Sequence, residues 1–272
     1  MKILLEICLL FLILANVQTQ IFLSEGKEEE KNQLEIEYLK GVLDQETVLS
    51  YPKQLSSDKK HGVIVWAPGN GSKAGDYEAI IRRLASHGFV VIGLSMTPGD
   101  GSKAIEALNF LEQKNKSPDS PLNGKLDINT VGCSGHSMGG SECRKAIVND
   151  KRIITAILNN SGDWEHVGMA KIPADKPVAI VYANNGMEKP HAEADYGNEN
   201  VKAPSCLIMM DGADYGHGSG PWDGMAATVA WLRWHLGGEA FRKADFVGTS
   251  GKYINEAIIG HKGNWKGQCK NF

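Results

Sequence analysis

The stretch Ile128-Asn-Thr-Val-Gly-Cys-Ser-Gly-His-Ser-Met-Gly-Gly-Ser141 decides the fold. Its first half predicts a buried strand over 128–133, and the residues that follow predict a helix over 138–148. Gly135-His-Ser-Met-Gly139 therefore lies on the turn between strand and helix. A serine on such a turn projects its hydroxyl above the sheet, and the glycines leave room for a strained backbone. We expect Ser137 to be presented in this way.

The sequence on both sides of this turn repeats the alternation of strand and helix. Helical patterns begin after Asp76 and at Ser102, and the last helix ends at Gly237-Gly238. Further apolar runs predict strands at 63–66, 89–92, 153–158, 178–182 and 206–210. Continuous apolar strands that alternate with amphipathic helices are typical of a parallel sheet covered on both faces. The sequence thus predicts an α/β fold with a mostly parallel central sheet and helices on both sides.

Composition limits the kind of partner. The 272 residues are 42% hydrophobic and 22% charged, which suits one globular domain. The formal net charge of −3 provides no basic surface signal, so we expect no nucleic-acid partner.

The N-terminus has the pattern of a secretory signal peptide. Lys2 precedes an apolar run from Ile3 to Ala15, which is interrupted by Glu6 and is short for a membrane span. We predict a signal peptide over 1–19 and a secreted protein with no stable membrane insertion after signal removal. The alternative is an uncleaved anchor or a buried helix. A charged N-terminal segment (20–45), a catalytic domain (46–248) and a C-terminal tail packed on it (249–272) follow.

The cysteines leave their pairing open. Cys8 would leave with the signal, and four others remain, which allow three pairings. These are Cys133, Cys143, Cys206 and Cys269. None forms a C-x-x-C motif, so no zinc or redox site is indicated.

A serine nucleophile needs a base. His217 lies in Gly216-His-Gly-Ser-Gly220, after the last predicted core strand, and this gives the chain order serine, acid, histidine. His136 is adjacent to Ser137, so the turn aims it elsewhere. We expect His136 to line the substrate pocket or to pack beside it.

Two backbone amides are candidates for an oxyanion hole. Met138 begins the helix, whose N–H groups point toward the place where Ser137 would attack a carbonyl. The loop Ala67-Pro-Gly-Asn-Gly-Ser72 follows the first core strand, and the amide of Asn70 is its candidate. An ordinary glycine turn is the alternative interpretation of this loop.

Several segments together resemble a known family. They are Leu84-Ala-Ser-His-Gly-Phe-Val-Val-Ile92, Gly124-Lys-Leu-Asp127, Gly135-His-Ser-Met-Gly-Gly140, Ala230-Trp-Leu-Arg-Trp234 and Phe246-Val-Gly248. Over about Val48 to Gly248 the chain resembles the dienelactone-hydrolase and cutinase-type (PET-hydrolase-like) polyester hydrolases. The resemblance implies an α/β-hydrolase fold, a serine esterase without cofactor and a shallow surface cleft. It also implies functional roles for Ser137, His217 and the amides of Asn70 and Met138.

The acid departs from the family pattern. The resemblance places Gly186 where an aspartate is expected, and Glu188 is the only acid in the loop over 182–190. Glutamate serves in related triads, so Glu188 is the first candidate. Asp163 and Asp214 are the alternatives.

Two positions bear on substrate binding. Trp164 follows the strand next to that of Ser137, and we predict that it contacts substrate; plain packing is the alternative. Asn70 replaces the aromatic residue of many polyester hydrolases, which lowers the expectation of strong binding to aromatic polymers.

These residues predict cleavage of a small-molecule or polymeric carboxylic ester through an acyl-enzyme on Ser137, with no cofactor and no metal. The spacing of metal ligands could be mimicked by His191, Glu193 and Asp195, but we interpret this segment as a polar loop. Two alternatives remain: a catalytically impaired, hydrolase-like binding protein, and an amidase or acyltransferase that uses the same site.

Overall fold

The computed structural model describes residues 33–56 and 58–272. The predicted signal peptide lies outside the described residues. Leu34–Ile258 and Lys262–Phe272 form one compact unit. Within the described residues, no helix is both long and apolar enough to cross a membrane.

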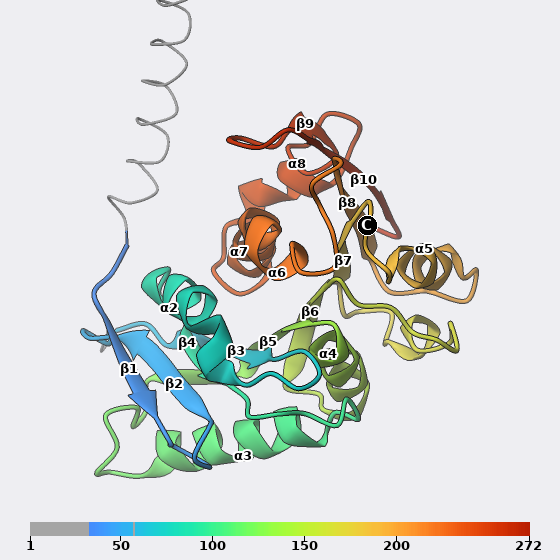
Figure 1. Ribbon diagram of the computed structural model, residues 1–272. Coiled ribbons are helices and arrows are strands. Elements are labelled where there is room, and N and C mark those ends of the chain that lie inside the picture. The colour runs from blue at the N-terminus through green and yellow to red at the C-terminus, as the bar shows by residue number, and fades with distance from the viewer. Residues whose placement is uncertain (1–32, 57) are drawn as a thin grey trace, which may run out of the picture. The chain divides into compact units, whose positions relative to one another are not determined.

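The compact unit is built on one sheet with the strand order β1-β2-β4-β3-β5-β6-β7-β8-β10-β9 (Figure 1). The six strands from β4 to β8 in this order are parallel, and antiparallel pairs extend both edges. The strands are β1 (Ile36–Lys40), β2 (Val48–Pro52), β3 (His61–Ala67), β4 (Val90–Gly93), β5 (Leu126–His136), β6 (Ile153–Asn159), β7 (Val178–Ala183), β8 (Ser205–Asp211), β9 (Asn255–Ala257) and β10 (Asn264–Lys270). The predicted fold class is confirmed.

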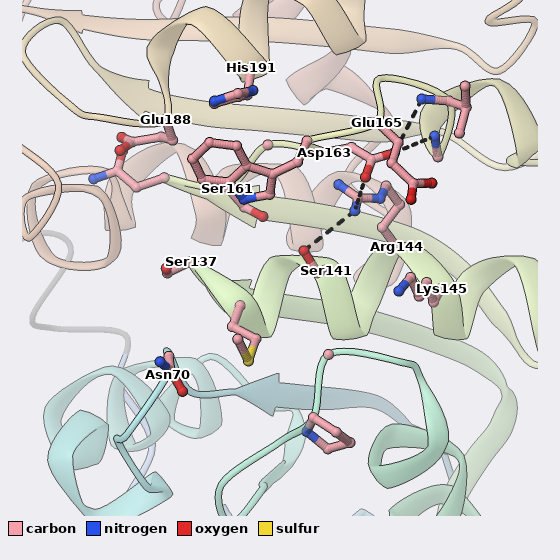
Figure 2. A pocket seen from close by; sticks show the side chains of 18 of the residues that line it. Asn70, Ser137, Ser141, Arg144, Lys145, Ser161, Asp163, Glu165, Glu188 and His191 are labelled. Carbon is pink, nitrogen blue, oxygen red and sulfur yellow. Dashed lines mark hydrogen bonds and ion pairs between the residues drawn. The ribbon is translucent and has the colours of Figure 1, made fainter.

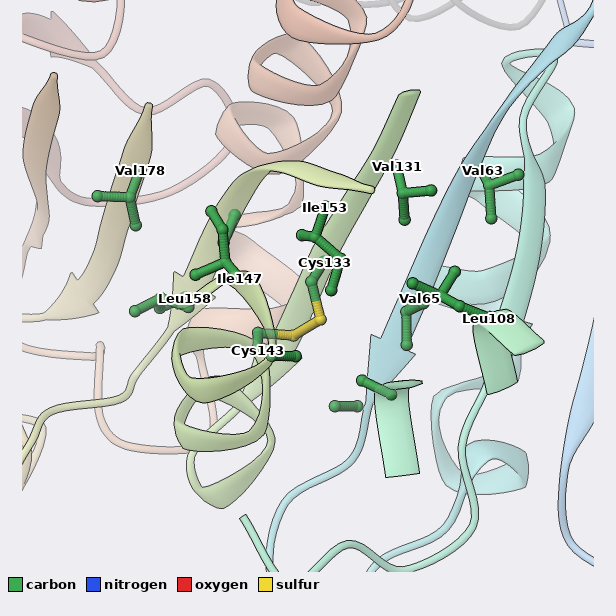
Figure 3. Packing of buried hydrophobic residues seen from close by; sticks show 14 of the residues in the cluster. Val63, Val65, Leu108, Val131, Cys133, Cys143, Ile147, Ile153, Leu158 and Val178 are labelled. Carbon is green, nitrogen blue, oxygen red and sulfur yellow. A yellow bond between two sulfur atoms is a disulfide. The ribbon is translucent and has the colours of Figure 1, made fainter. Parts of the chain in front are cut away.

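Helices cover both faces of this sheet. They are η1 (Ala74–Tyr77), α2 (Glu78–Ser86), α3 (Ser102–Lys116), α4 (Met138–Asn149), η2 (Met169–Lys171), α5 (Lys189–Gly197), α6 (Gly220–Asp223), α7 (Met225–His235), η3 (Ala240–Arg242) and α8 (Lys243–Phe246). Alternate side chains of β3 point to opposite faces, as the pleat requires. Val63 and Val65 pack with α3 and α4 (Figure 3), while Ile64 and Trp66 pack with α2 and α7.

Two buried charged side chains tie α4 to its neighbours in the fold. The carboxylate of Glu142, on α4, accepts hydrogen bonds from the N–H groups of Gly101 (3.0 Å) and Ala104 (2.9 Å) at the start of α3. The ammonium group of Lys176 donates to the carbonyls of Ile147 (2.7 Å) and Asp150 (2.9 Å), at the end of α4. Helix termini leave such backbone groups without partners, so these contacts hold α4 in place beneath Ser137.

Two disulfides resolve the pairing that the sequence leaves open. Cys133 on β5 is bonded to Cys143 on α4 (Figure 3), and Cys206 on β8 is bonded to Cys269 on β10. The first bond links the strand before Ser137 to the helix after it. The second ties the C-terminal strand to the parallel core of the sheet.

The compact unit extends beyond 46–248 at both ends. β1 lies in the segment predicted as charged and pairs with β2, Ile36 opposite Pro52. β9 and β10 lie in the tail, and β10 pairs with β8 rather than only packing on the surface. Strands at or next to the edge of a sheet are partly exposed, so their apolar pattern is weak. Their backbone hydrogen bonds to a neighbour place them in the sheet.

Candidate active site

Ser137 occupies a strained turn between β5 and α4. Its backbone has φ 54° and ψ −117°, and its N–H donates to the carbonyl of Asn159 on β6 (2.9 Å). A Cβ at Gly135 would lie 2.4 Å from the oxygen of Gly139, and a Cβ at Gly139 would lie 2.0 Å from the oxygen of Ala67. Only glycine fits at either position. The geometry is that of a nucleophile elbow, in which close packing enforces strain at the serine.

The predicted base and acid are in contact. His217 Nδ1 lies 2.8 Å from Glu188 Oε2, and the Glu188 side chain is 6% exposed. His217 comes from the loop between β8 and α6, and Glu188 from the residue before α5. The tight pair leaves Nε2 of the imidazole for a different partner. Ser137 and His217 line the same cleft without a hydrogen bond between their side chains, a contact that often tightens only when substrate binds.

The two alternative acids, Asp163 and Asp214, lie away from the ring of His217. Asp163 is 3.2 Å from Arg144 and accepts the N–H groups of Val167 and Gly168. Burial opposes ionisation of Asp163, but Arg144 and these N–H groups outweigh it and lower the pKa of the carboxyl group. Asp214 is exposed on the loop that carries His217. Neither carboxylate forms an ion pair or hydrogen bond with His217 in the described part of the chain.

The cleft that contains Ser137 has a volume of about 670 Å³. Helix α4 lines it along one stripe, with Met138, Ser141, Lys145 and Val148 at helical spacing. Asn70 lies on one side of Ser137, and the loop after β6 lies on the other (Figure 2). Of the predicted site residues, the cleft brings together Asn70, Ser137, Met138, Trp164, Glu188 and His217. Their catalytic and binding roles stay predictions.

The indole of Trp164 stands at the rim of the cleft and is 73% exposed. Its ring centroid lies 4.0 Å from that of His191, which projects from α5. The buried carboxylate of Asp195, also on α5, accepts the N–H of Asp163 (2.6 Å) and so fixes the loop that carries Trp164. Burial raises the pKa of Asp195. The segment over 191–195 is thus part of a helix and not the predicted polar loop.

Because it is helical, this segment places His191 and Asp195 on one face, and Glu193 points elsewhere and accepts the hydroxyl of Tyr182 (3.0 Å). No group of three or more His, Cys, Asp or Glu side chains in residues 33–56 and 58–272 is arranged to hold a metal ion.

His136 does not line the cleft, so its predicted substrate-binding role is corrected to the packing position that was the other expectation. The ring is directed away from the cleft, and both of its nitrogens have partners: Tyr77 Oη lies 2.8 Å from Nδ1, and the carbonyl oxygen of His217 lies 3.0 Å from Nε2. The strained turn at Ser137 sends neighbouring side chains to opposite sides, so Ser137 faces the cleft while His136 faces the loop of His217. Burial lowers the pKa of His136.

Asn160 is a site residue that the sequence reasoning missed. Its backbone has φ 43°, and its Oδ1 accepts the N–H of Ala183 at the end of β7 (2.9 Å). Its Nδ2 donates to the carbonyls of Gly216 (3.1 Å) and His217. Asn160 thereby joins β6 and β7 to the histidine loop. Ala183 lies 23 residues away in sequence and the histidine loop more than 50, and no local pattern marks these contacts.

A parallel sheet, a serine on a tight turn after its central strand, and an acid and a histidine on loops after later strands define the α/β-hydrolase fold. The comparisons with known proteins agree. The PET hydrolase-like family model (PETase) matches residues 45–250, and the chain belongs to that family.

The chain is also similar to a bis(hydroxyethyl) terephthalate hydrolase of Streptomyces coelicolor (strain ATCC BAA-471 / A3(2) / M145). The two are 29% identical over 178 residues, which cover 61% of this chain and 53% of the relative. The chain thus spans about half the length of that curated relative.

Proposed function

We propose that this protein is a serine hydrolase that cleaves carboxylic esters through an acyl-enzyme on Ser137. The observation that carries the proposal is the 2.8 Å contact between His217 and Glu188 in the cleft that Ser137 lines. A histidine held by a carboxylate at one nitrogen is fixed in the tautomer that accepts a proton at the other.

In the proposed reaction, His217 Nε2 removes the proton of Ser137 as the hydroxyl attacks the ester carbonyl. The amides of Met138 and Asn70 stabilise the oxyanion, and Glu188 stabilises the imidazolium. His217 then gives its proton to the leaving alcohol. Water hydrolyses the acyl-enzyme by the same steps and restores Ser137.

Family membership and the named activity of the Streptomyces relative support an ester as substrate. The surface beside Ser137 fits a partly apolar acyl or alcohol group, because the exposed side chains of Trp164 and Met187 stand over the cleft. Asn70 on the opposite side presents a polar amide. We therefore propose small or oligomeric esters rather than a tightly bound aromatic polymer.

A fluorophosphonate probe tests the proposal directly, since it reacts with an activated serine. The purified protein should be labelled and should hydrolyse p-nitrophenyl acetate and bis(hydroxyethyl) terephthalate. Ser137→Ala should lose both properties while its circular dichroism spectrum stays unchanged. A folded wild-type protein that is neither labelled nor active would favour the binding-protein alternative. Turnover of anilides in preference to esters would favour an amidase.

A further inference from the structure

A continuous string of buried and partly buried hydrogen bonds connects three loops of the candidate site. The N–H of Gly69 donates to Tyr77 Oη (3.2 Å), which lies 2.8 Å from His136 Nδ1. His136 Nε2 lies 3.0 Å from the carbonyl oxygen of His217. Gly69 precedes Asn70 in the loop of the expected second oxyanion amide, and His136 precedes Ser137.

The donors, the acceptors and burial together favour one protonation state for this string. The carbonyl of His217 can only accept, so His136 Nε2 must carry a proton. Tyr77 Oη already accepts the N–H of Gly69, so its own proton is free to point at Nδ1. His136 is then neutral with its proton on Nε2. The burial that lowers the pKa of His136 acts in the same direction.

The tyrosine ring makes a second connection to the histidine loop. It stacks on Trp222, on α6 just after that loop, with ring centroids 5.9 Å apart and an interplanar angle of 10°. The carbonyl of His217 has a second donor in Asn160. Loss of the His136 contact therefore leaves the loop attached, although less firmly oriented.

We propose that Tyr77 and His136 are positioning residues that hold the Gly69–Asn70 backbone and the His217 loop in one fixed relation. This inference rests on the proposed function. The oxyanion amide and the base must act on the same carbonyl, and a misplacement of about 1 Å costs on the order of a hundredfold in rate. The string is buried at Gly69 and partly buried at His136, and away from water hydrogen bonds are stronger and an unpaired group is costly. A side chain that merely fills space needs none of these hydrogen bonds.

Tyr77→Phe tests the string most cleanly, because it removes Oη and keeps the ring that stacks on Trp222. We expect kcat for p-nitrophenyl acetate to fall about tenfold or more, with KM changed less than about twofold and a similar melting temperature. The rate of fluorophosphonate labelling should fall in parallel. Tyr253→Phe is the matched control: it removes a hydroxyl that donates to the carbonyl of Ala226 (2.9 Å), outside the cleft, and should retain activity.

A double-mutant cycle separates positioning from packing. His136→Phe removes both ring contacts, so adding Tyr77→Phe to it should cost little more. If the two substitutions lower kcat independently, so that their effects multiply in the double variant, the proposal is wrong. It is also wrong if Tyr77→Phe changes only KM or the melting temperature.

A second measurement does not depend on activity. Nitrogen-15 spectra of histidine-labelled protein should show His136 neutral with its proton on Nε2 at neutral pH. Tyr77→Phe should also shift the resonances of the His217 ring. A charged His136, or the Nδ1–H tautomer, would contradict the proposed arrangement of these hydrogen bonds. A wild-type protein with the expected spectrum but no esterase activity would refute the proposed function and leave the string in place.

Discussion

The carboxylate of Glu188 occupies the space into which a side chain at Gly186 would project. A Cβ at Gly186 would lie 2.1 Å from Glu188 Oε1 and 2.7 Å from Oε2. The resemblance to polyester hydrolases places an aspartate at position 186. In this chain the acid is Glu188, two residues later. Its longer side chain reaches back to the space beside Gly186. A carboxylate from position 188 can therefore take the place in space that the resemblance gives to position 186.

The first prediction concerns this acid. Glu188→Gln should lower kcat on the order of a hundredfold or more, because a neutral amide neither fixes the His217 tautomer nor stabilises the imidazolium. Steady-state kinetics with p-nitrophenyl acetate measure this. Asp214→Asn and Asp163→Asn should have far milder effects on kcat. If Asp163→Asn lowers kcat as much as Glu188→Gln does, the catalytic acid is Asp163, in the loop after β6.

The second prediction moves the carboxylate back along the chain. Glu188→Ala should be nearly inactive, and adding Gly186→Asp should recover part of kcat, because the shorter side chain starts where the Glu188 carboxylate now lies. Gly186→Asp alone should impair the enzyme, since two carboxylates compete for one space. If the double variant is no more active than Glu188→Ala, the two positions are not interchangeable.

The third prediction concerns the buried Glu142. Glu142→Ala should reduce the free energy of unfolding by about 1–3 kcal/mol, because it leaves the N–H groups of Gly101 and Ala104 unpaired. Urea unfolding followed by circular dichroism measures this. Glu106→Gln removes an exposed carboxylate that pairs with Lys103 and should change stability by less than about 1 kcal/mol. Equal effects of the two variants would show that the capping contact is unimportant.

The fourth prediction is a pH dependence at Asp163. Its pKa is lower in the folded protein than the ordinary value of 3.8, so its ionised form stabilises the fold. This contribution is complete above the unfolded pKa and is lost as the pH falls through the folded pKa. The stability difference between wild type and Asp163→Asn should therefore shrink as the pH falls below about 4. Urea unfolding at pH 6 and pH 3 compares them, and a constant difference would contradict the assignment.

The fifth prediction concerns secretion, which we propose from the pattern over 1–19 and which the two disulfides support. The mature chain should begin between Val17 and Ile21. Mass spectrometry of secreted protein identifies the first residue. An intact Met1, or protein found only in the cytosol, would refute the signal peptide.

Local features of this fold are encoded in short stretches of sequence, whereas contacts between distant segments are not. The elbow at Ser137 is encoded within about a dozen residues, because the strand pattern, the glycines and the helix pattern are contiguous. The helix predicted after Asp76 begins instead at Glu78, since the Asp76 carboxylate accepts the N–H of Lys73 and stabilises the preceding 3-10 turn. Element type was thus predictable, and boundaries depended on individual hydrogen bonds.

The candidate site was predictable only in part. Chain order and loop position single out His217, and the loop after β7 offers Glu188 as its only acid. The 2.8 Å contact between them joins residues 29 positions apart and depends on how two loops meet above the sheet. The direction of the His136 ring and the contacts of Asn160 likewise depend on loops that other strands bring together.

By itself, the sequence determined the α/β class, the strained serine turn and the order of the predicted catalytic residues, because periodicity and turn chemistry act over short stretches of chain. Only the tertiary structure decided the cysteine pairing, the antiparallel strands β1, β9 and β10, and the carboxylate that meets His217. These features depend on contacts between distant segments. Their geometry is set when the sheet assembles, and nothing in the neighbouring residues encodes it.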